Sequence, residues 1–262
     1  MGVQRRALRA ELLKIKYSPI IWITFAAFAL APIMGAVFMI IMRNPETLAK
    51  ASGLNAKAQM MNISASWNSY FGILTQAVGV GGVLIFGFVS SWIFGREYSD
   101  GTAKDLLSLP ISKSKILNAK FVIYVAWCFV LVLSNLIIGV ILGIILKLPS
   151  FDSIITSSQL TDYFITTVIT VLIGTPIAFF AIWGKGYLAP LGFVALTLVI
   201  AQIIGATGYG AYFPWSIPGL YSGAGGEYKN QLSSISYLIL LATCVLGYLA
   251  TTLYWQKADQ TK

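Results

Sequence analysis

Histidine is absent from this 262-residue sequence, and only 10% of its residues are charged. Without histidine, the chain cannot form a histidine-ligated metal or haem site, nor a histidine-based catalytic centre. A soluble domain usually carries about 25% charged residues. Because 57% of the residues are hydrophobic, too few polar side chains remain to cover a surface in water. The composition therefore indicates an integral membrane protein.

Other absences exclude further classes of function. None of the nine acidic residues lies in the middle of an apolar run, whereas ion pumps and proton-coupled carriers usually keep an ionisable group at membrane depth. The two cysteines, Cys128 and Cys244, lie in separate apolar runs, and this placement supports neither a disulfide nor a metal site. The motif G-x-x-x-x-G-K-[ST] is missing, so the chain cannot bind ATP through a P-loop of its own.

The apolar residues form six blocks long enough to cross a bilayer. A helix rises 1.5 Å per residue, so a hydrocarbon core of about 30 Å requires about 20 apolar residues. The blocks cover about residues 20–42, 71–94, 121–146, 163–183, 188–213 and 237–255. The first block is too long for the apolar core of a signal peptide, so we expect it to remain in the protein. The fold class expected is therefore an all-α integral membrane protein, with six transmembrane helices in a single domain over residues 1–262.

The positive residues indicate the orientation of these helices. The N-terminus, the loops after the second and fourth blocks and the C-terminus hold 13 lysines and arginines, against five in the other loops. Positive residues accumulate on the cytoplasmic side of membrane proteins. We therefore expect a multi-pass protein of the cell membrane with both termini in the cytoplasm. The net charge of +9 then reflects topology and attraction to the anionic lipid bilayer, and no nucleic-acid partner is expected.

Residues 1–19 are basic and amphipathic. Leu8, Leu12 and Ile15 fall at i, i+4 and i+7, so they share one face of a helix. This pattern predicts an N-terminal helix that lies in the plane of the membrane interface. A solvated positive segment that only sets the topology explains the composition equally well.

The loop between the second and third blocks predicts a short cytoplasmic helix. Thr102 and Asp105 have the spacing of a capping box, and Pro110 cannot continue a helix that begins there. We expect Leu106 and Leu107 to project from this helix. A short apolar helix between charged flanks can fill a groove on a soluble partner, and a lipid-facing turn is the alternative.

This loop resembles that of the ABC-2 type permeases of ABC exporters. The family pattern is an acidic residue, then Gly-Thr, then Leu-Leu-x-x-Pro-Ile-Ser, and finally a lysine that enters the third span. The matching residues here are Glu97, Gly101, Thr102, Leu106, Leu107, Pro110, Ile111, Ser112 and Lys120. Two more stretches, residues 184–190 and 212–218, are similar to the branch of bacitracin- and lantibiotic-resistance permeases.

The resemblance implies a non-catalytic permease subunit that works with a separate ABC ATPase. Two copies of the ATPase would bind ATP and Mg and would serve a dimer of permease subunits, for which a homodimer is expected. No cofactor is then expected in this chain. The motif match assigns coupling to the ATPase to Glu97, Gly101, Thr102, Leu106, Leu107 and Pro110. The branch favours export of an antimicrobial peptide or antibiotic, and a small drug, sodium or a polysaccharide precursor stays open as cargo.

The segment between the fifth and sixth blocks, residues 213–236, combines helix breakers with apolar side chains. Pro214 and Pro218 interrupt regular structure, and Trp215 keeps the segment apolar. We predict a re-entrant outer segment in which these three residues contribute to an external gate, since irregular backbone is tolerated at membrane depth where protein or a cavity surrounds it. An interfacial loop anchored by Trp215 is the alternative.

Two other classes of function compete with the permease. A channel or sensor subunit without energy coupling has the same composition. A membrane-embedded enzyme would need a nucleophile with a base, or paired carboxylates, at one depth, and the absences described above oppose it. Copurification of an ATPase would separate the permease from the channel or sensor.

Overall fold

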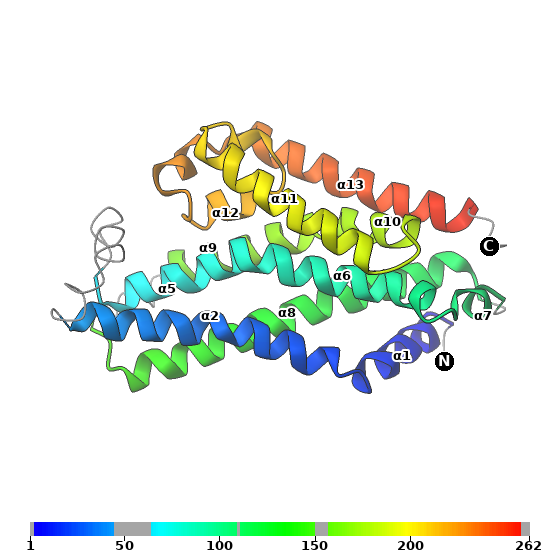
Figure 1. Cartoon of the computed structure of the whole chain (residues 1–262), viewed down its shortest axis with the longest axis horizontal. Coiled ribbons are helices and arrows are strands. Elements are labelled where there is room, and N and C mark those ends of the chain that lie inside the picture. Colours follow the sequence, from blue (N-terminus) through cyan, green and yellow to red (C-terminus); the bar gives the residue numbers. More distant parts are fainter. Residues whose placement is uncertain (1–2, 45–63, 109–110, 150–156, 258–262) are drawn as a thin grey trace.

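The computed structural model describes residues 3–44, 64–108, 111–149 and 157–257 (Figure 1). These residues form helices joined by turns, and no strand occurs among them. The helices are α1 (Val3–Lys16), α2 (Ile20–Arg43), α5 (Trp67–Gln76), α6 (Gly82–Ser99), α7 (Ala103–Ser108), α8 (Lys113–Ile145), α9 (Ser157–Ile173), α10 (Thr175–Trp183), α11 (Leu188–Ala206), α12 (Ile217–Tyr221) and α13 (Ser234–Lys257). Three short elements complete them, the π-helical η1 (Ala77–Gly81) and the 3-10 turns η3 (Gly210–Tyr212) and η4 (Gly226–Gln231).

The six predicted membrane helices are confirmed within the described residues. They are Ile20–Arg43, Trp67–Ser99, Lys113–Ile145, Ser158–Trp183, Leu188–Ala206 and Ser234–Lys257. The second of them joins α5, η1 and α6 end to end. The fifth is shorter than predicted, because the chain turns after Ala206 and Gly208 adopts a φ of +83°. The third helix begins at Lys113, before its predicted apolar block, so its first turns carry the lysines that precede the block.

The helices run along one long axis, and Figure 1 shows where their ends lie. The N-terminal helix α1, the short helix α7, the turn between α10 and α11 and the C-terminal end of α13 lie at one end of the bundle. These are the four segments that share the excess of positive charge in the sequence. The structure thus brings them together as the topology predicts.

The core of the bundle is aromatic. Trp67, Tyr70, Phe86, Tyr124 and Tyr163 are all almost completely buried between α5, α6, α8 and α9. Their polar groups have partners, since the Tyr70 hydroxyl donates to the carbonyl of Pro32 at 2.9 Å and the Tyr163 hydroxyl to that of Val132 at 2.9 Å. Buried tyrosines are stable where such a partner is available.

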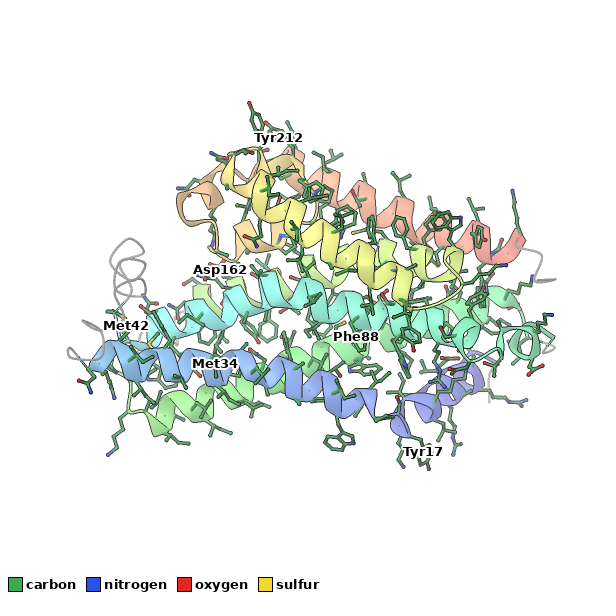
Figure 2. The ribbon with its side chains drawn as sticks, in the orientation of Figure 1. Tyr17, Met34, Met42, Phe88, Asp162 and Tyr212 are labelled. Carbon is green, nitrogen blue, oxygen red and sulfur yellow. The ribbon has the colours of Figure 1, made fainter. Side chains whose placement is uncertain are left out.

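The outward faces of α2, α11 and α13 carry large apolar side chains. Trp22, Ile203 and Leu238 are examples, each more than half exposed. Figure 2 shows Tyr17 and Tyr212 projecting away from the bundle, with exposed fractions of 77% and 59%. Continuous apolar exposure of this kind is rare on a soluble monomer. It fits a protein whose surface contacts lipid, with tyrosines of the type enriched at membrane interfaces.

Candidate coupling site and outer gate

The turn from α6 into α7 is built by a glycine. Gly101 has a φ of +71°, and the backbone N–H of Thr102 donates to the carbonyl of Glu97 at 2.9 Å while that of Gly101 donates to Tyr98 at 3.3 Å. This pair of hydrogen bonds is a Schellman motif, which ends a helix and redirects the chain. The short helix α7 begins at the next residue, Ala103, so the predicted short helix is confirmed.

The remaining predicted residues of this loop lie in or after α7. Leu106 and Leu107 belong to α7, whereas Pro110 lies outside the described residues. The chain re-enters a helix at Lys113, where the carbonyl of Ser112 accepts from the N–H of Lys115 at 2.9 Å. Helix α7 lies at the extreme end of the bundle, between α6 and α8 along the chain (Figure 1).

Glu97 is buried, whereas Gly101 and Thr102 of the same motif are exposed. The Glu97 side chain is 3% exposed and points into the bundle. One carboxylate oxygen, Oε1, accepts from Lys120 Nζ at 2.7 Å and from Lys14 Nζ at 3.0 Å. Lys120 also donates to the carbonyl of Ile93 at 2.8 Å. Glu97 thus lies inside the protein and joins α6 to α1 and α8.

Glu11 completes this group of charges. Its Oε1 lies 2.6 Å from Lys14 Nζ and its Oε2 lies 3.4 Å from Lys120 Nζ. Burial lowers the pKa of Lys14, but the carboxylates of Glu97 and Glu11 outweigh it and raise that pKa above its ordinary value. Sequence reasoning missed Glu11 and Lys14 as a pair, although their i, i+3 spacing inside an amphipathic helix was a signal.

Helix α1 packs on the bundle through one side only. Ile15 is buried in the core and Leu8 packs against it, mainly through α8. Leu12 is 51% exposed, so the three predicted apolar residues do not share one environment. Glu11, paired with Lys14 and Lys120, takes a buried position that the apolar pattern does not predict.

The segment after α11 folds back onto the bundle. In Figure 1, α12 lies alongside the other helices, short of the far ends of α2 and α5. It packs against α9 and η1, and Ile217 and Pro218 are buried. A Cβ atom on Gly79 would lie 2.6 Å from both the Pro218 carbonyl oxygen and the Ser222 Cβ. Only glycine lets α12 approach the second membrane helix this closely.

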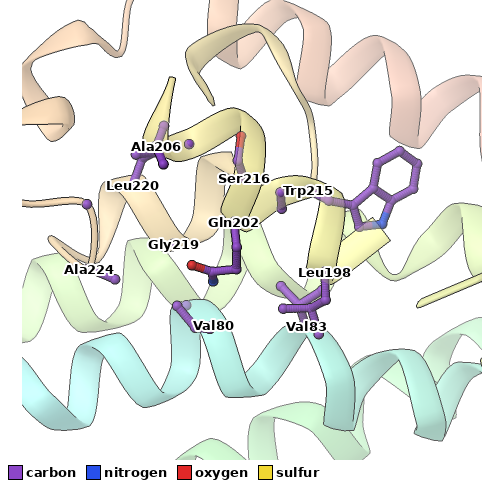
Figure 3. Close-up of a pocket in the computed structure, with 14 residues that line it drawn as sticks. Val80, Val83, Leu198, Gln202, Ala206, Trp215, Ser216, Gly219, Leu220 and Ala224 are labelled. Carbon is purple, nitrogen blue, oxygen red and sulfur yellow. The ribbon is translucent and has the colours of Figure 1, made fainter. Parts of the chain in front are cut away.

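A cavity of about 230 Å³ lies between this segment and the membrane helices (Figure 3). It is lined by Val80 and Val83 of the second membrane helix, Leu198 and Gln202 of α11, and Trp215, Ser216, Gly219 and Leu220 of the outer segment, among others. Gln202 points from α11 toward Val80. Of the predicted gate residues, Trp215 lines the cavity, Pro218 packs beside Gly79, and Pro214 is half-buried next to Trp215.

An ion pair holds the other side of the outer segment. Asp162, at the start of α9 (Figure 2), accepts from the Tyr221 hydroxyl at 3.2 Å and from Lys229 Nζ at 3.2 Å. Lys229 also lies 4.9 Å from the centre of the Tyr221 ring. Burial and the carboxylate of Asp162 raise the pKa of Tyr221 to about 12, so its hydroxyl keeps its proton at neutral pH. Sequence reasoning missed this group because its members are far apart along the chain.

Sequence comparison relates this chain to known proteins. A family model described as an ABC-2 family transporter protein matches residues 7–203, which is most of the chain. The chain belongs to the ABC-2 transporter family. It is also 27% identical over 178 residues to the bacitracin transport permease protein BCRB of Bacillus licheniformis, over 68% of this chain and 85% of that protein. No solved structure matches it.

Membership in the ABC-2 family confirms the resemblance first seen in the α6–α7 loop, and with six apolar helices it establishes a multi-pass membrane permease. In this ABC-2 permease, the structure brings Gly101, Thr102, Leu106 and Leu107 together at the end of the bundle. The family match stops at residue 203, so the outer segment lies beyond it. The prediction that it forms a gate therefore depends on the geometry described above.

Proposed function

We propose that this chain is the membrane-spanning subunit of an ATP-driven exporter, and that a separate ATPase chain hydrolyses the ATP. The observation that carries this proposal is the projecting helix α7 in an ABC-2 family chain. The Schellman turn fixes α7 to the last turn of α6, so force applied to α7 reaches a membrane helix directly. The sequence lacks a P-loop, which requires that the nucleotide bind elsewhere.

The proposed complex contains two permease subunits, taken as identical, and two ATPase subunits. Its positive end, with α1, α7 and both termini, faces the cytoplasm, because 13 of the 18 lysines and arginines fall there. ATP and Mg bind to the ATPase pair, and closure of that pair displaces α7. Nucleotide state and permease conformation are then linked, so each biases the other.

The cavity beneath the outer segment is proposed as part of the export path. None of the described residues that line it is charged, and Gln202 and Ser216 supply its polar side chains. Apolar walls with a few placed polar groups suit a hydrophobic or amphiphilic cargo. The relative's printed name concerns bacitracin transport, which favours an antimicrobial peptide or antibiotic as the cargo. The outer segment, with Trp215 and Pro218, would serve as the gate that releases it.

Copurification tests the proposal. The tagged parent and Leu106→Asp are purified in mild detergent from cells that also express the neighbouring genes, and the chains that copurify are identified and assayed for ATP hydrolysis. Leu188→Asp is the matched control, because Leu188 is 74% exposed at the same end of the bundle but belongs to α11. All three must elute as monodisperse proteins in gel filtration.

A P-loop ATPase that accompanies the parent and Leu188→Asp, and is lost with Leu106→Asp, supports the proposal and the docking role of α7. A well-folded parent that brings no ATPase contradicts it, and a channel or sensor subunit without energy coupling then becomes the better account.

A further inference from the structure

Four charged side chains from three helices meet at the positive end of the bundle, and three of them are buried while Lys14 is half-buried. Glu11 and Lys14 come from α1, Glu97 from α6 and Lys120 from α8. Glu11, Glu97 and Lys120 are 6%, 3% and 1% exposed. Burying charge is costly unless it is paired, and here two cations meet two anions at 2.6 to 3.4 Å. We call this group the buried tetrad.

The buried tetrad differs from an ordinary surface salt bridge. An exposed ion pair adds little stability because water screens it and its side chains lose freedom. A buried charge that loses its partner is left without compensation, which is strongly unfavourable. Lys120 would be such a charge, since Glu97, Glu11 and the Ile93 carbonyl are its acceptors inside the bundle. Ion pairs of this group therefore join α1, α6 and α8 to one another.

The tetrad is connected to the turn that carries α7. The carbonyl of Glu97 accepts the N–H of Thr102 in the Schellman turn, while the carboxylate of the same residue binds Lys14 and Lys120. Arg96, the preceding residue, also donates to the Lys14 carbonyl at 3.4 Å near the end of α1, where a cation is favourable. One turn of α6 thus contacts α7, α1 and α8 at once.

We propose that Glu11, Lys14, Glu97 and Lys120 are positioning residues that clamp α1 and α8 to the end of α6. The clamp makes α1 part of the moving unit, so a displacement of α7 carries three helices rather than one. The clamp itself follows from the geometry of this chain. Its part in energy coupling rests on the proposed function.

Hydrogen exchange of the purified permease in lipid nanodiscs tests the clamp without any ATPase. The parent is compared with Lys120→Met and Glu97→Gln. The matched control is Lys115→Met, which removes an exposed lysine five residues earlier on α8. We expect the amides of α1 to exchange at least about tenfold faster in the two tetrad variants, because the loss of one charge leaves the tetrad with a net charge that is not compensated, and α1 then opens locally. The control should match the parent.

Unchanged α1 exchange in a well-folded Lys120→Met protein would overturn the clamp. If that variant does not fold, Lys14→Met replaces it, because the Lys14 side chain is 27% exposed and its loss is milder. Its matched control is Lys16→Met, which removes an exposed lysine from the same helix. Faster exchange in Lys14→Met alone supports the clamp, and equal exchange in both variants refutes it.

A second readout separates positioning from plain stability. In complex with the ATPase, the tetrad variants should still copurify with it, because α7 is intact, but nucleotide should no longer change the exchange of α1. A nucleotide response of α1 equal to that of the parent would contradict the coupling role. An ATPase missing from the parent would refute the proposed function, while the exchange of the isolated permease would still decide the clamp.

Discussion

The outer segment packs closely against the second membrane helix at Gly79, because glycine has no side chain to keep the two apart. In Gly79→Ala, the new Cβ would lie 2.6 Å from the Pro218 carbonyl oxygen and from the Ser222 Cβ, whereas ordinary contact begins at 3.4 Å. The difference, 3.4 minus 2.6, is 0.8 Å, so α12 must move by about that distance. Overpacking of this size typically costs about 1–3 kcal/mol. The outer segment should therefore loosen or lift from η1.

The matched control is Gly81→Ala in the same π-helical element. A Cβ on Gly81 meets no atom within 4 Å, so this change should be neutral or slightly stabilising, since alanine favours a helix over glycine by about 1 kcal/mol. Thermal unfolding in nanodiscs and hydrogen exchange of residues 213–222 measure the two variants side by side. We expect lower stability and faster exchange in Gly79→Ala only. Equal behaviour of the two variants would refute the close seating of α12.

Three further outcomes follow from the geometry. In Gly95→Ala, the Cβ would lie 2.5 Å from the Gly186 carbonyl oxygen, so the free energy of unfolding should fall by about 1–3 kcal/mol. In the control Gly192→Ala, the Cβ meets no atom within 4 Å, so the free energy of unfolding should not change. Asp162→Asn should weaken the contact of the outer segment with α9 and raise its proteolysis rate about two- to fivefold, an increase that high salt should mimic in the parent. The pKa of Lys14 is raised above 10.5, so the stability difference between parent and Lys14→Met should be constant around neutral pH and shrink as the pH rises through the raised pKa.

The sequence predicts the parts of this fold that depend on local patterns. Apolar runs predict the six membrane helices, because a helix needs a minimum length to cross the bilayer. The capping residues and Pro110 predict a short helix, which begins at Ala103 in the structure. The end of α11 was missed because residues 207–213 are apolar enough to continue a span, while the positive φ of Gly208 redirects the chain.

The buried tetrad and the seat of α12 lie beyond local patterns. Lys120 and Glu11 are separated by 109 positions, and the loop motif that ends at Lys120 carries no sign of this partner. The apolar pattern of α1 likewise carries no sign that Glu11 faces the bundle, where it pairs with Lys14 and Lys120. Such contacts depend on which helices become neighbours in the folded bundle, and local sequence patterns do not encode that.

The central claim is that ATP acts through α7 on the cavity beneath the outer segment. Val83 lines that cavity and is 4% exposed, so Val83→Cys places a thiol of nearly equal size there. In the reconstituted complex with its ATPase, with Cys128 and Cys244 changed to serine, labelling by a polar maleimide is measured with and without ATP. We predict a labelling rate that changes with ATP and loses that response when Leu106→Asp is added. A rate that ignores ATP, or a response that survives Leu106→Asp, would contradict the account.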